Sequence, residues 1–176
     1  MSNRINLSSF SPGPNDKIFV DNNVFMYMFY IMGNYQQEKV DAYSNTFKSM
    51  LINKSIIYTS SIVLSEFFNS YMKIEYSLLK NQYPNYKKDF RPSVDFSVLS
   101  KEITNIIKNK ILTSCKKIND DFDIIDINSI LKNEENIPFD FNDKYIATLC
   151  EKNKIKILTD DKDFLNFNNN VDIITF

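Results

Sequence analysis

The chain has 176 residues, which is the size of one domain. Hydrophobic residues make up 43% and charged residues 24%, so the sequence can bury a core and is not of the disordered class. The 21 Lys and Arg nearly balance the 22 Asp and Glu, which excludes a strongly basic protein that coats nucleic acid without specificity. His is absent, and this excludes His-based triads, His acid–base pairs and ordinary zinc sites.

The N-terminal residues 1–14 are polar and lack the apolar centre of a signal peptide, so we expect a flexible, loop-like lead. The longest apolar run, over 24–32, is shorter than the roughly 20 residues that span a bilayer. The only two cysteines, Cys115 and Cys150, form no disulfide framework and are expected to be buried, inert thiols. These features predict a cytoplasmic protein without membrane contact.

Short β-branched runs alternate with stretches of helical periodicity along the rest of the chain. Strands are predicted over 17–20, 55–59, 122–127, 155–159 and 171–175. Helices are predicted over 24–30, 39–53, 61–74 and 97–118, and a further helix begins at an Asn142 cap. This alternation predicts an α/β sandwich around a mostly parallel sheet of about five strands. We expect a single domain over 15–176, with a helical and loop insertion around 75–121.

Several acidic residues directly follow or border buried structure. Asp21 comes straight after the first predicted strand, and Asp161 and Asp163 follow a later one. Because ligands collect at the carboxyl ends of parallel strands, we expect these acids at one edge of the sheet. Glu66 lies beside the apolar stripe of its helix. Asp143 opens its helix, where the helix N-terminus favours the ionised form.

Carboxylates gathered in this way repel one another. Two unit charges about 4 Å apart repel by about 4 kcal/mol at an effective dielectric near 20, so such a group protonates or binds a cation. Oxygen ligands without His or Cys suit Mg²⁺ or Mn²⁺ rather than Zn²⁺. Taken alone, each acid is more often a helix-start residue, a turn residue or a solvated side chain. The prediction of a site therefore rests on the combination and order of the acids.

Four segments of the chain share a pattern with one family. They are Ile18–Val24 (IFVDNNV), Thr59–Phe67 (TSSIVLSEF), Phe141–Ala147 (FNDKYIA) and Ile157–Phe164 (ILTDDKDF). In this order they resemble the motifs of PIN-domain ribonucleases, and the resemblance spans most of residues 17–176.

The resemblance implies a twisted parallel sheet between helices and hydrolysis of RNA phosphodiester bonds by water that one or two Mg²⁺ or Mn²⁺ ions activate. The acids that would hold the metal are Asp21, Glu66, Asp143 and Asp161, with Asp163 as a fifth. The residues that would support these ligands are Asn23, Thr159 and Asp160. The resemblance also implies an RNA substrate and a homodimer. For small bacterial members it further implies a VapC-like toxin role held in check by an antitoxin.

The sequence leaves some alternatives open. Asp160 directly precedes Asp161, so either acid could be the ligand, and spacing favours Asp161. Asn22 stands where many relatives have Ser or Thr. An aspartyl phosphatase with Asp21 as nucleophile is disfavoured, because Asn23 stands where the general acid would be needed. A non-catalytic PIN-fold module that binds RNA or protein is the other reading.

A basic segment lies within the expected insertion. Its cations are Lys87, Lys88 and Arg91, and its interleaved aromatic residues are Tyr83, Tyr86 and Phe90. Such a pattern is typical of an arm that contacts RNA, because cations bind phosphate and aromatic rings stack on bases. The alternative interpretation is a solvated loop pinned by its aromatic residues.

Overall fold

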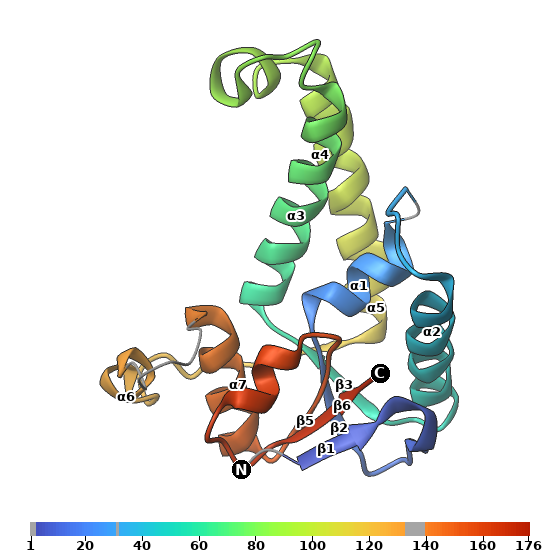
Figure 1. The fold of residues 1–176 in the computed structure, drawn as a ribbon, viewed down its shortest axis with the longest axis vertical. Helices are drawn as coiled ribbons and strands as arrows, with labels where there is room; N and C mark the ends of the chain where they lie inside the picture. The colour runs from blue at the N-terminus through green and yellow to red at the C-terminus, as the bar shows by residue number, and fades with distance from the viewer. Residues whose placement is uncertain (1–2, 31, 133–139) are drawn as a thin grey trace.

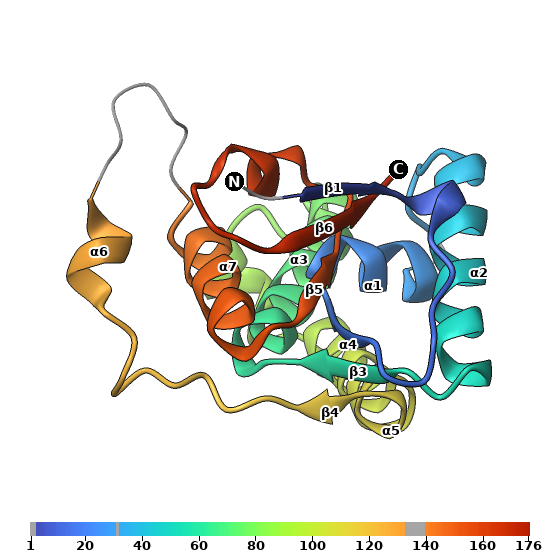
Figure 2. The ribbon, with the colours of Figure 1, turned by 90° about the horizontal axis from the view of Figure 1, so that it is seen from below.

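The computed structural model describes residues 3–30, 32–132 and 140–176, and it contains one six-stranded sheet (Figures 1 and 2). The strands are β1 (Asn3–Asn6), β2 (Lys17–Val20), β3 (Ile56–Thr59), β4 (Lys116–Lys117), β5 (Lys156–Leu158) and β6 (Asp172–Thr175). Every pairing is parallel, in the order β1-β6-β5-β2-β3-β4. The predicted α/β class is thereby confirmed, with six strands where about five were expected.

Helices cover both faces of this sheet. They are α1 (Asn22–Phe29), α2 (Gln37–Ile52), α3 (Ser61–Leu79), α4 (Val94–Ile106), α5 (Leu112–Ser114), α6 (Ile127–Leu131) and α7 (Phe141–Asn153). Short 3₁₀ and π-helical segments complete the set: η1 (Leu7–Ser9), η2 (Tyr86–Phe90), η3 (Ile107–Ile111) and η4 (Lys162–Asn166). In Figure 2, α7 lies on one side of the sheet and α1 and α2 lie on the other.

The central strand β2 determines where the first acid lies. Its residues Ile18, Phe19 and Val20 are completely buried, and it pairs with β3 on one side and β5 on the other. Val20 aligns with Leu158 across the β2–β5 pairing. The residues that follow these two strands therefore emerge side by side at the carboxyl edge of the sheet.

A helical hairpin extends away from the sheet in Figure 1. It consists of α3 on one side and the consecutive segments α4, η3 and α5 on the other, and the chain turns at η2. Helix α1 packs against α3, and α3 packs against α4. The predicted helix over 61–74 is longer than expected, because α3 continues to Leu79.

The predicted strand over 122–127 is wrong. These residues form turns and the start of α6, and the strand at this edge is the two-residue β4. Phe122 and Ile124 are 65% and 61% exposed, so their apolar character does not reflect burial in the sheet. The predicted helix over 97–118 also ends earlier, since Lys116 and Lys117 belong to β4.

The N-terminal lead also differs from the expectation of a loop. Asn3–Asn6 form β1, which pairs with β6 at the edge of the sheet, and Leu7 is buried in the core. Arg4 Nη2 donates a hydrogen bond to the backbone oxygen of Phe176 at 3.0 Å. The polar sequence of β1 conceals a strand whose stability comes from backbone pairing. Met1 and Ser2 of the predicted lead, and Ile31 of the apolar run, lie outside the described residues.

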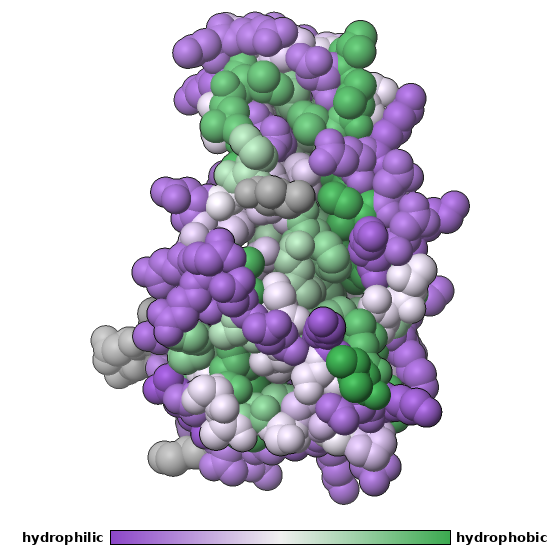
Figure 3. Space-filling model, turned by 90° about the vertical axis from the view of Figure 1, so that its right-hand side faces the viewer, coloured by the Kyte–Doolittle hydropathy of each residue, from purple (hydrophilic) through white to green (hydrophobic). Residues whose placement is uncertain are grey.

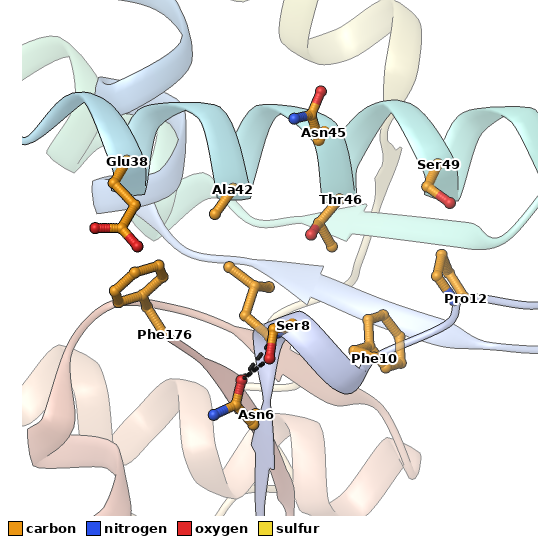
Figure 4. A pocket seen from close by; sticks show the side chains of 11 residues that line it. Asn6, Ser8, Phe10, Pro12, Glu38, Ala42, Asn45, Thr46, Ser49 and Phe176 are labelled. Atoms are coloured by element: carbon orange, nitrogen blue, oxygen red, sulfur yellow. Dashed lines mark hydrogen bonds between the residues drawn. The ribbon is translucent and has the colours of Figure 1, made fainter.

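A surface pocket of about 520 Å³ lies between this N-terminal segment and α2 (Figure 4). Phe10 and Phe176 line it together with polar side chains such as Glu38 and Asn45. None of the predicted metal-holding acids lines this pocket, so it is separate from the candidate site.

The predicted burial of the two cysteines agrees with the structure. Cys115 and Cys150 are free and buried, and burial raises the pKa of the Cys115 thiol to about 12. Neither thiol is therefore a reactive thiolate at neutral pH. Over the described residues, no helix has both the length and the apolar character needed to cross a membrane.

Candidate active site

Asp21 lies at the junction between β2 and α1, where the strand ends and the helix begins. Its Oδ1 accepts a hydrogen bond from the backbone N–H of Asn22 at 2.6 Å, which makes it the N-cap of α1. The residue is only 5% exposed. The pKa of Asp21 is raised to about 6: burial raises it most, hydrogen bonds from Thr159 and Asn22 lower it, and the charges of Glu66 and Asp161 raise it.

Thr159 and Asn23 both hold the other carboxylate oxygen of Asp21. The Thr159 hydroxyl donates to Asp21 Oδ2 at 2.7 Å, and Asn23 Nδ2 donates to the same oxygen at 2.8 Å. Asn23 Nδ2 also lies 3.0 Å from Thr159 Oγ1. Since each carboxylate oxygen has a donor, the orientation of Asp21 is fixed. Asn23 and Thr159 thus both contact the first acid, and their role as supporting groups stays a prediction.

Glu66 lies on α3 with its carboxylate directed toward α7. Asn142 Nδ2, in the first turn of α7, donates to Glu66 Oε1 at 2.6 Å. Burial raises the pKa of Glu66, the hydrogen bond from Asn142 lowers it, and the charge of Asp140 raises it. Asn142 therefore connects two helices that the sequence separates by 76 positions.

Asp143 is the acid whose ionisation the surroundings oppose most clearly. Its pKa rises to about 8, first because of burial and then because of the charges of Asp21, Asp140, Asp161 and Glu66. The sequence predicted that the helix N-terminus would favour ionised Asp143. Burial and four neighbouring acids outweigh that effect, since the helix-terminus contribution is typically below about 1 kcal/mol.

The residue that caps α7 is Asp140 rather than the predicted Asn142. Asp140 Oδ1 accepts hydrogen bonds from the backbone N–H groups of Asn142 at 2.8 Å and Asp143 at 3.4 Å. The cap places an additional negative charge beside Glu66 and Asp143.

Asp161 is the N-cap of η4 and lies three positions after the last residue of β5. Its Oδ1 accepts a hydrogen bond from the backbone N–H of Asp163 at 2.9 Å, and its own N–H donates to Thr159 Oγ1 at 2.9 Å. Its charge raises the pKa of both Asp21 and Asp143. Asp161 is therefore electrostatically part of the acidic group, and Asp163 follows it on the same short helical turn.

Asp160 has a different environment from its neighbour Asp161. Lys39 Nζ forms an ion pair with Asp160 Oδ2 at 2.6 Å, and the Tyr27 hydroxyl donates to the same oxygen at 2.6 Å. The Tyr43 hydroxyl lies 3.2 Å from Asp160 Oδ1 and donates to the Thr159 carbonyl at 2.9 Å. Burial is the main cause of a raised pKa at both tyrosines, so they are neutral donors.

This group, which we call the Asp160 anchor, consists of Asp160, Lys39, Tyr27 and Tyr43. The backbone N–H of Asp160 also donates to Asn23 Oδ1 at 3.1 Å. Tyr27 lies on α1 and Lys39 and Tyr43 lie on α2, so the anchor connects these two helices to the loop that follows β5. Through Asn23, which also contacts Asp21, the anchor is connected to the first acid.

The predicted basic arm residues lie apart from the acids. Lys87, Lys88 and Arg91 are exposed, and the η2 segment is at the far end of the helical hairpin in Figure 1. Phe90 is completely buried against Tyr76, Tyr83 and the other aromatic rings at this end. These rings pack against one another, as the alternative interpretation of the segment expected.

Sequence analysis missed several residues of the acidic group and its support. They are Asp140, Asn142 as a partner of Glu66, Lys39, Tyr27 and Tyr43. Asp140 carried a signal, because Asp is a preferred N-cap and stands directly before the first helical residue of α7. The anchor carried no sequence signal, because more than a hundred positions separate Asp160 from Tyr27 and Lys39.

The donor chemistry of the acidic group suits a hard cation, since it consists of carboxylate oxygens without His or Cys ligands. Within residues 3–30, 32–132 and 140–176, no group of three or more His, Cys, Asp or Glu side chains is arranged to hold a metal ion. The carboxylates are thus near enough to perturb one another and are not gathered into ready-made coordination.

A family model of the PIN domain matches residues 18–170 of this chain. The match covers most of the sequence and includes all four acids named above, so the chain belongs to the PIN domain family. Comparison with curated proteins gives no match.

The solved structures that are similar to this chain have low sequence identity to it. The structure of FitAcB from Neisseria gonorrhoeae is 15% identical, with 89% of this chain and 96% of that chain covered and a TM-score of 0.51. VapBC2 from Rickettsia felis, bound to a DNA fragment from its promoter, is 14% identical over 88% and 96%, with a TM-score of 0.49. PAE2754 from Pyrobaculum aerophilum is 15% identical over 89% of each chain, with a TM-score of 0.47. The FitAcB likeness concerns the fold alone.

Proposed function

We propose that this protein is an endoribonuclease that depends on Mg²⁺ or Mn²⁺ and hydrolyses phosphodiester bonds in RNA. The observation that carries the proposal is the environment of Asp143, whose pKa rises to about 8 through burial and the charges of four other acids. Carboxylates buried together become stable as anions when a cation binds among them. Membership of the PIN domain family supports the same reaction.

The residues that would hold the ion are Asp21, Glu66, Asp143 and Asp161, with Asp163 as a further acid on η4. Their oxygen-only chemistry fits Mg²⁺ or Mn²⁺. When bound, such an ion lowers the pKa of water and neutralises phosphate charge.

The surrounding polar residues orient these acids before the substrate arrives. Thr159 and Asn23 fix Asp21, and Asn142 fixes Glu66. Partners of this kind keep a ligand in one rotamer and maintain its basicity. Within the Asp160 anchor, Asp160 already forms an ion pair with Lys39, and this supports Asp161 rather than Asp160 as the ligand.

A toxin role extends this proposal. The four motif segments resemble those of small bacterial PIN-domain toxins, and on this basis we propose a VapC-like toxin that forms a homodimer and is restrained by a separate antitoxin. Induced expression in bacteria should then arrest growth, and the Asp143→Asn protein should not. Equal growth arrest by both proteins would count against a toxin role that depends on catalysis.

The direct test is cleavage of a bulk tRNA mixture by the purified protein in Mg²⁺. We expect Asp21→Asn and Asp143→Asn each to lower the cleavage rate by at least about a hundredfold, because cation stabilisation of the transition state amounts to several kcal/mol. EDTA should abolish cleavage, and added Mn²⁺ should restore it.

The matched control is Asp41→Asn on α2. Asp41 is an exposed acid that accepts a hydrogen bond from Gln37 and lies outside the acidic group. Its replacement should leave the cleavage rate unchanged. Undiminished cleavage in EDTA, or by the Asp143→Asn protein, would contradict the proposal, and folded protein without any cleavage would favour the non-catalytic binding module.

A further inference from the structure

The charge of the chain is unevenly distributed between the distal part of the hairpin and the rest. We call residues 73–110 the arm. The arm contains eight Lys or Arg and four Asp or Glu, which gives it a net charge of +4. The remaining residues contain 13 cations and 18 acids, with a net charge of −5. The near-neutral total thus conceals a basic arm on an acidic body.

The cations of the arm are directed to solvent. All eight are exposed, namely Lys73, Lys80, Lys87, Lys88, Arg91, Lys101, Lys108 and Lys110. Among the described residues, none of them forms an ion pair within 4 Å. Figure 3 shows hydrophilic side chains projecting along the borders of the arm, with apolar side chains between them.

Three of the four acids of the arm accept hydrogen bonds, two of them from groups within the arm. Asp95 Oδ2 accepts a hydrogen bond from the Tyr83 hydroxyl at 2.8 Å, and Glu102 Oε1 accepts one from the Tyr71 hydroxyl at 2.7 Å. Asp89 Oδ2 accepts one from the backbone N–H of Asn85 at 2.8 Å. These neutral donors hold three acids in place without removing their charge, so the net charge of the arm remains +4.

The end of the arm is held rigid by its aromatic residues. Phe90 is completely buried, with ring centroids of Tyr76, Tyr83 and Phe96 between 5.1 and 5.6 Å away. Asn85 caps η2 by accepting a hydrogen bond from the N–H of Lys88 at 2.9 Å. A packed core of this kind lowers the entropy lost when the neighbouring cations bind a partner.

We propose that the arm binds the phosphate backbone of RNA at a distance from the point of cleavage. This inference rests on the proposed ribonuclease function and names the class of its substrate. Phe90 is buried and Tyr86 is 36% exposed, while all eight cations are exposed, so the surface fits contacts to phosphate more than contacts to bases. Glu66 and the end of α3 at Leu79 belong to the same helix. Thirteen residues of helix span on the order of 20 Å, so an RNA must extend at least that far to contact both.

The proposal therefore predicts a preference for extended or structured RNA over short oligonucleotides. A trinucleotide at the acids cannot reach the far end of the arm at Lys87, Lys88 and Arg91, because successive stacked phosphates are only about 3.4 Å apart. A tRNA can contact both regions at once.

The test compares a triple variant of the arm end, Lys87→Gln with Lys88→Gln and Arg91→Gln, with the unmodified protein. For cleavage of bulk tRNA, we expect KM to rise about tenfold at moderate salt, and the slope of log affinity against log salt to fall by about 2. Cleavage of a trinucleotide should proceed at an unchanged kcat/KM. The matched control replaces three exposed cations of the body, Lys17→Gln, Lys48→Gln and Lys54→Asn, and should leave both substrates unaffected.

Binding of bulk tRNA is measured separately in an Asp21→Asn background, with and without the arm substitutions. If the arm substitutions weaken the binding of tRNA to the Asp21→Asn protein, the result supports the proposal. It does so even if the unmodified protein cleaves no RNA and the ribonuclease function fails. Equal tRNA binding and equal salt slopes with and without the arm substitutions overturn it. In that case the arm serves another partner, such as an acidic protein, while cleavage by the unmodified protein would still support the ribonuclease function.

Discussion

At the scale of single residues, two adjacent aspartates have opposite surroundings. Asp160 pairs with the Lys39 cation and accepts a hydrogen bond from the Tyr27 hydroxyl, whereas Asp161 caps η4 and adds its charge to the acidic group. The sequence alone left the choice between them open, because both follow the same strand. Contacts from α1 and α2 distinguish them, and no local pattern encodes those contacts.

The Asp160 anchor yields a prediction that separates positioning from metal binding. Lys39→Met leaves Asp160 partly buried without its cation, so we expect a loss of stability of about 1–3 kcal/mol in urea unfolding. We expect kcat to fall with little change in KM, because Thr159 and Asn23 lose a fixed neighbour. Lys39→Arg should recover most of both quantities.

Asp160→Asn provides the complementary measurement. Its neutral side chain keeps an oxygen for the tyrosine hydroxyls, so the variant should retain more cleavage activity than Asp161→Asn. If Asp160→Asn were inactive and Asp161→Asn active, Asp160 would be the ligand and the anchor would have been misassigned.

The raised pKa of Asp143 yields a pH dependence of stability in metal-free protein. Folded Asp143 holds its proton up to a pH of about 8, whereas the unfolded chain releases it near the ordinary value of 3.8. The folded state therefore binds more protons in this window, and stability falls as pH rises through it. Asp143→Asn should show a smaller fall in Tm between acidic and alkaline pH in EDTA.

Asp41→Asn is again the control for that experiment, because this exposed acid should leave the pH dependence unchanged. Added Mn²⁺ should raise the Tm of the unmodified protein most at alkaline pH, since a ligand of the folded state stabilises it. Parallel Tm curves for the unmodified and Asp143→Asn proteins in EDTA would show that Asp143 is not in a repulsive environment.

At the scale of elements, the reliability of sequence patterns depended on burial. Buried strands such as β2 and β5 and the amphipathic helix α2 could be predicted, because their apolar periodicity reflects the core. The run over 122–127 has the same apolar character but is largely exposed, and β4 has only Lys116 and Lys117. Strand β1 was hidden for the opposite reason, since three of its four side chains are polar and exposed and only Ile5 packs on the core, while backbone pairing with β6 holds the strand.

The residues of the candidate site also differ in how far the sequence could predict them. Asp21, Glu66, Asp143 and Asp161 could be named from motifs that each lie within one segment, and their placement as ligands stays a prediction. Partners that cross between elements, such as Asn142 and Lys39, could not be inferred from one sequence, because they depend on how helices pack.

The helix cap at Asp140 gives a prediction at this scale. Asp140→Ala removes the acceptor for the first N–H groups of α7, so we expect a loss of about 1 kcal/mol and a Tm lower by roughly 2–4 °C. Asp140→Asn keeps an accepting oxygen and removes a charge beside Glu66 and Asp143, so it should match or exceed the stability of the unmodified protein. If both variants lost stability equally in urea, the charge of Asp140 rather than its cap would be what stabilises α7.

At the scale of the whole molecule, acids and cations are segregated along one hairpin. Glu66 lies in the part of α3 near the sheet, whereas the exposed cations begin at Lys73 and continue to the end of the arm. The same helix therefore links an acidic catalytic region, as proposed, to a basic surface. A negatively charged polymer is attracted by one end of this molecule and repelled by the other unless a cation is present.

The two borders of the sheet also differ in what they offer to another chain. At one border, β4 is only two residues long and both are lysines, and short charged strands resist intermolecular pairing. At the opposite border, β1 is four residues long, with polar and largely exposed side chains and no further strand beside it in the described fold. Aggregation through strand addition should therefore begin at the β1 border, and lysine or proline substitutions placed there would improve the behaviour of the protein at high concentration.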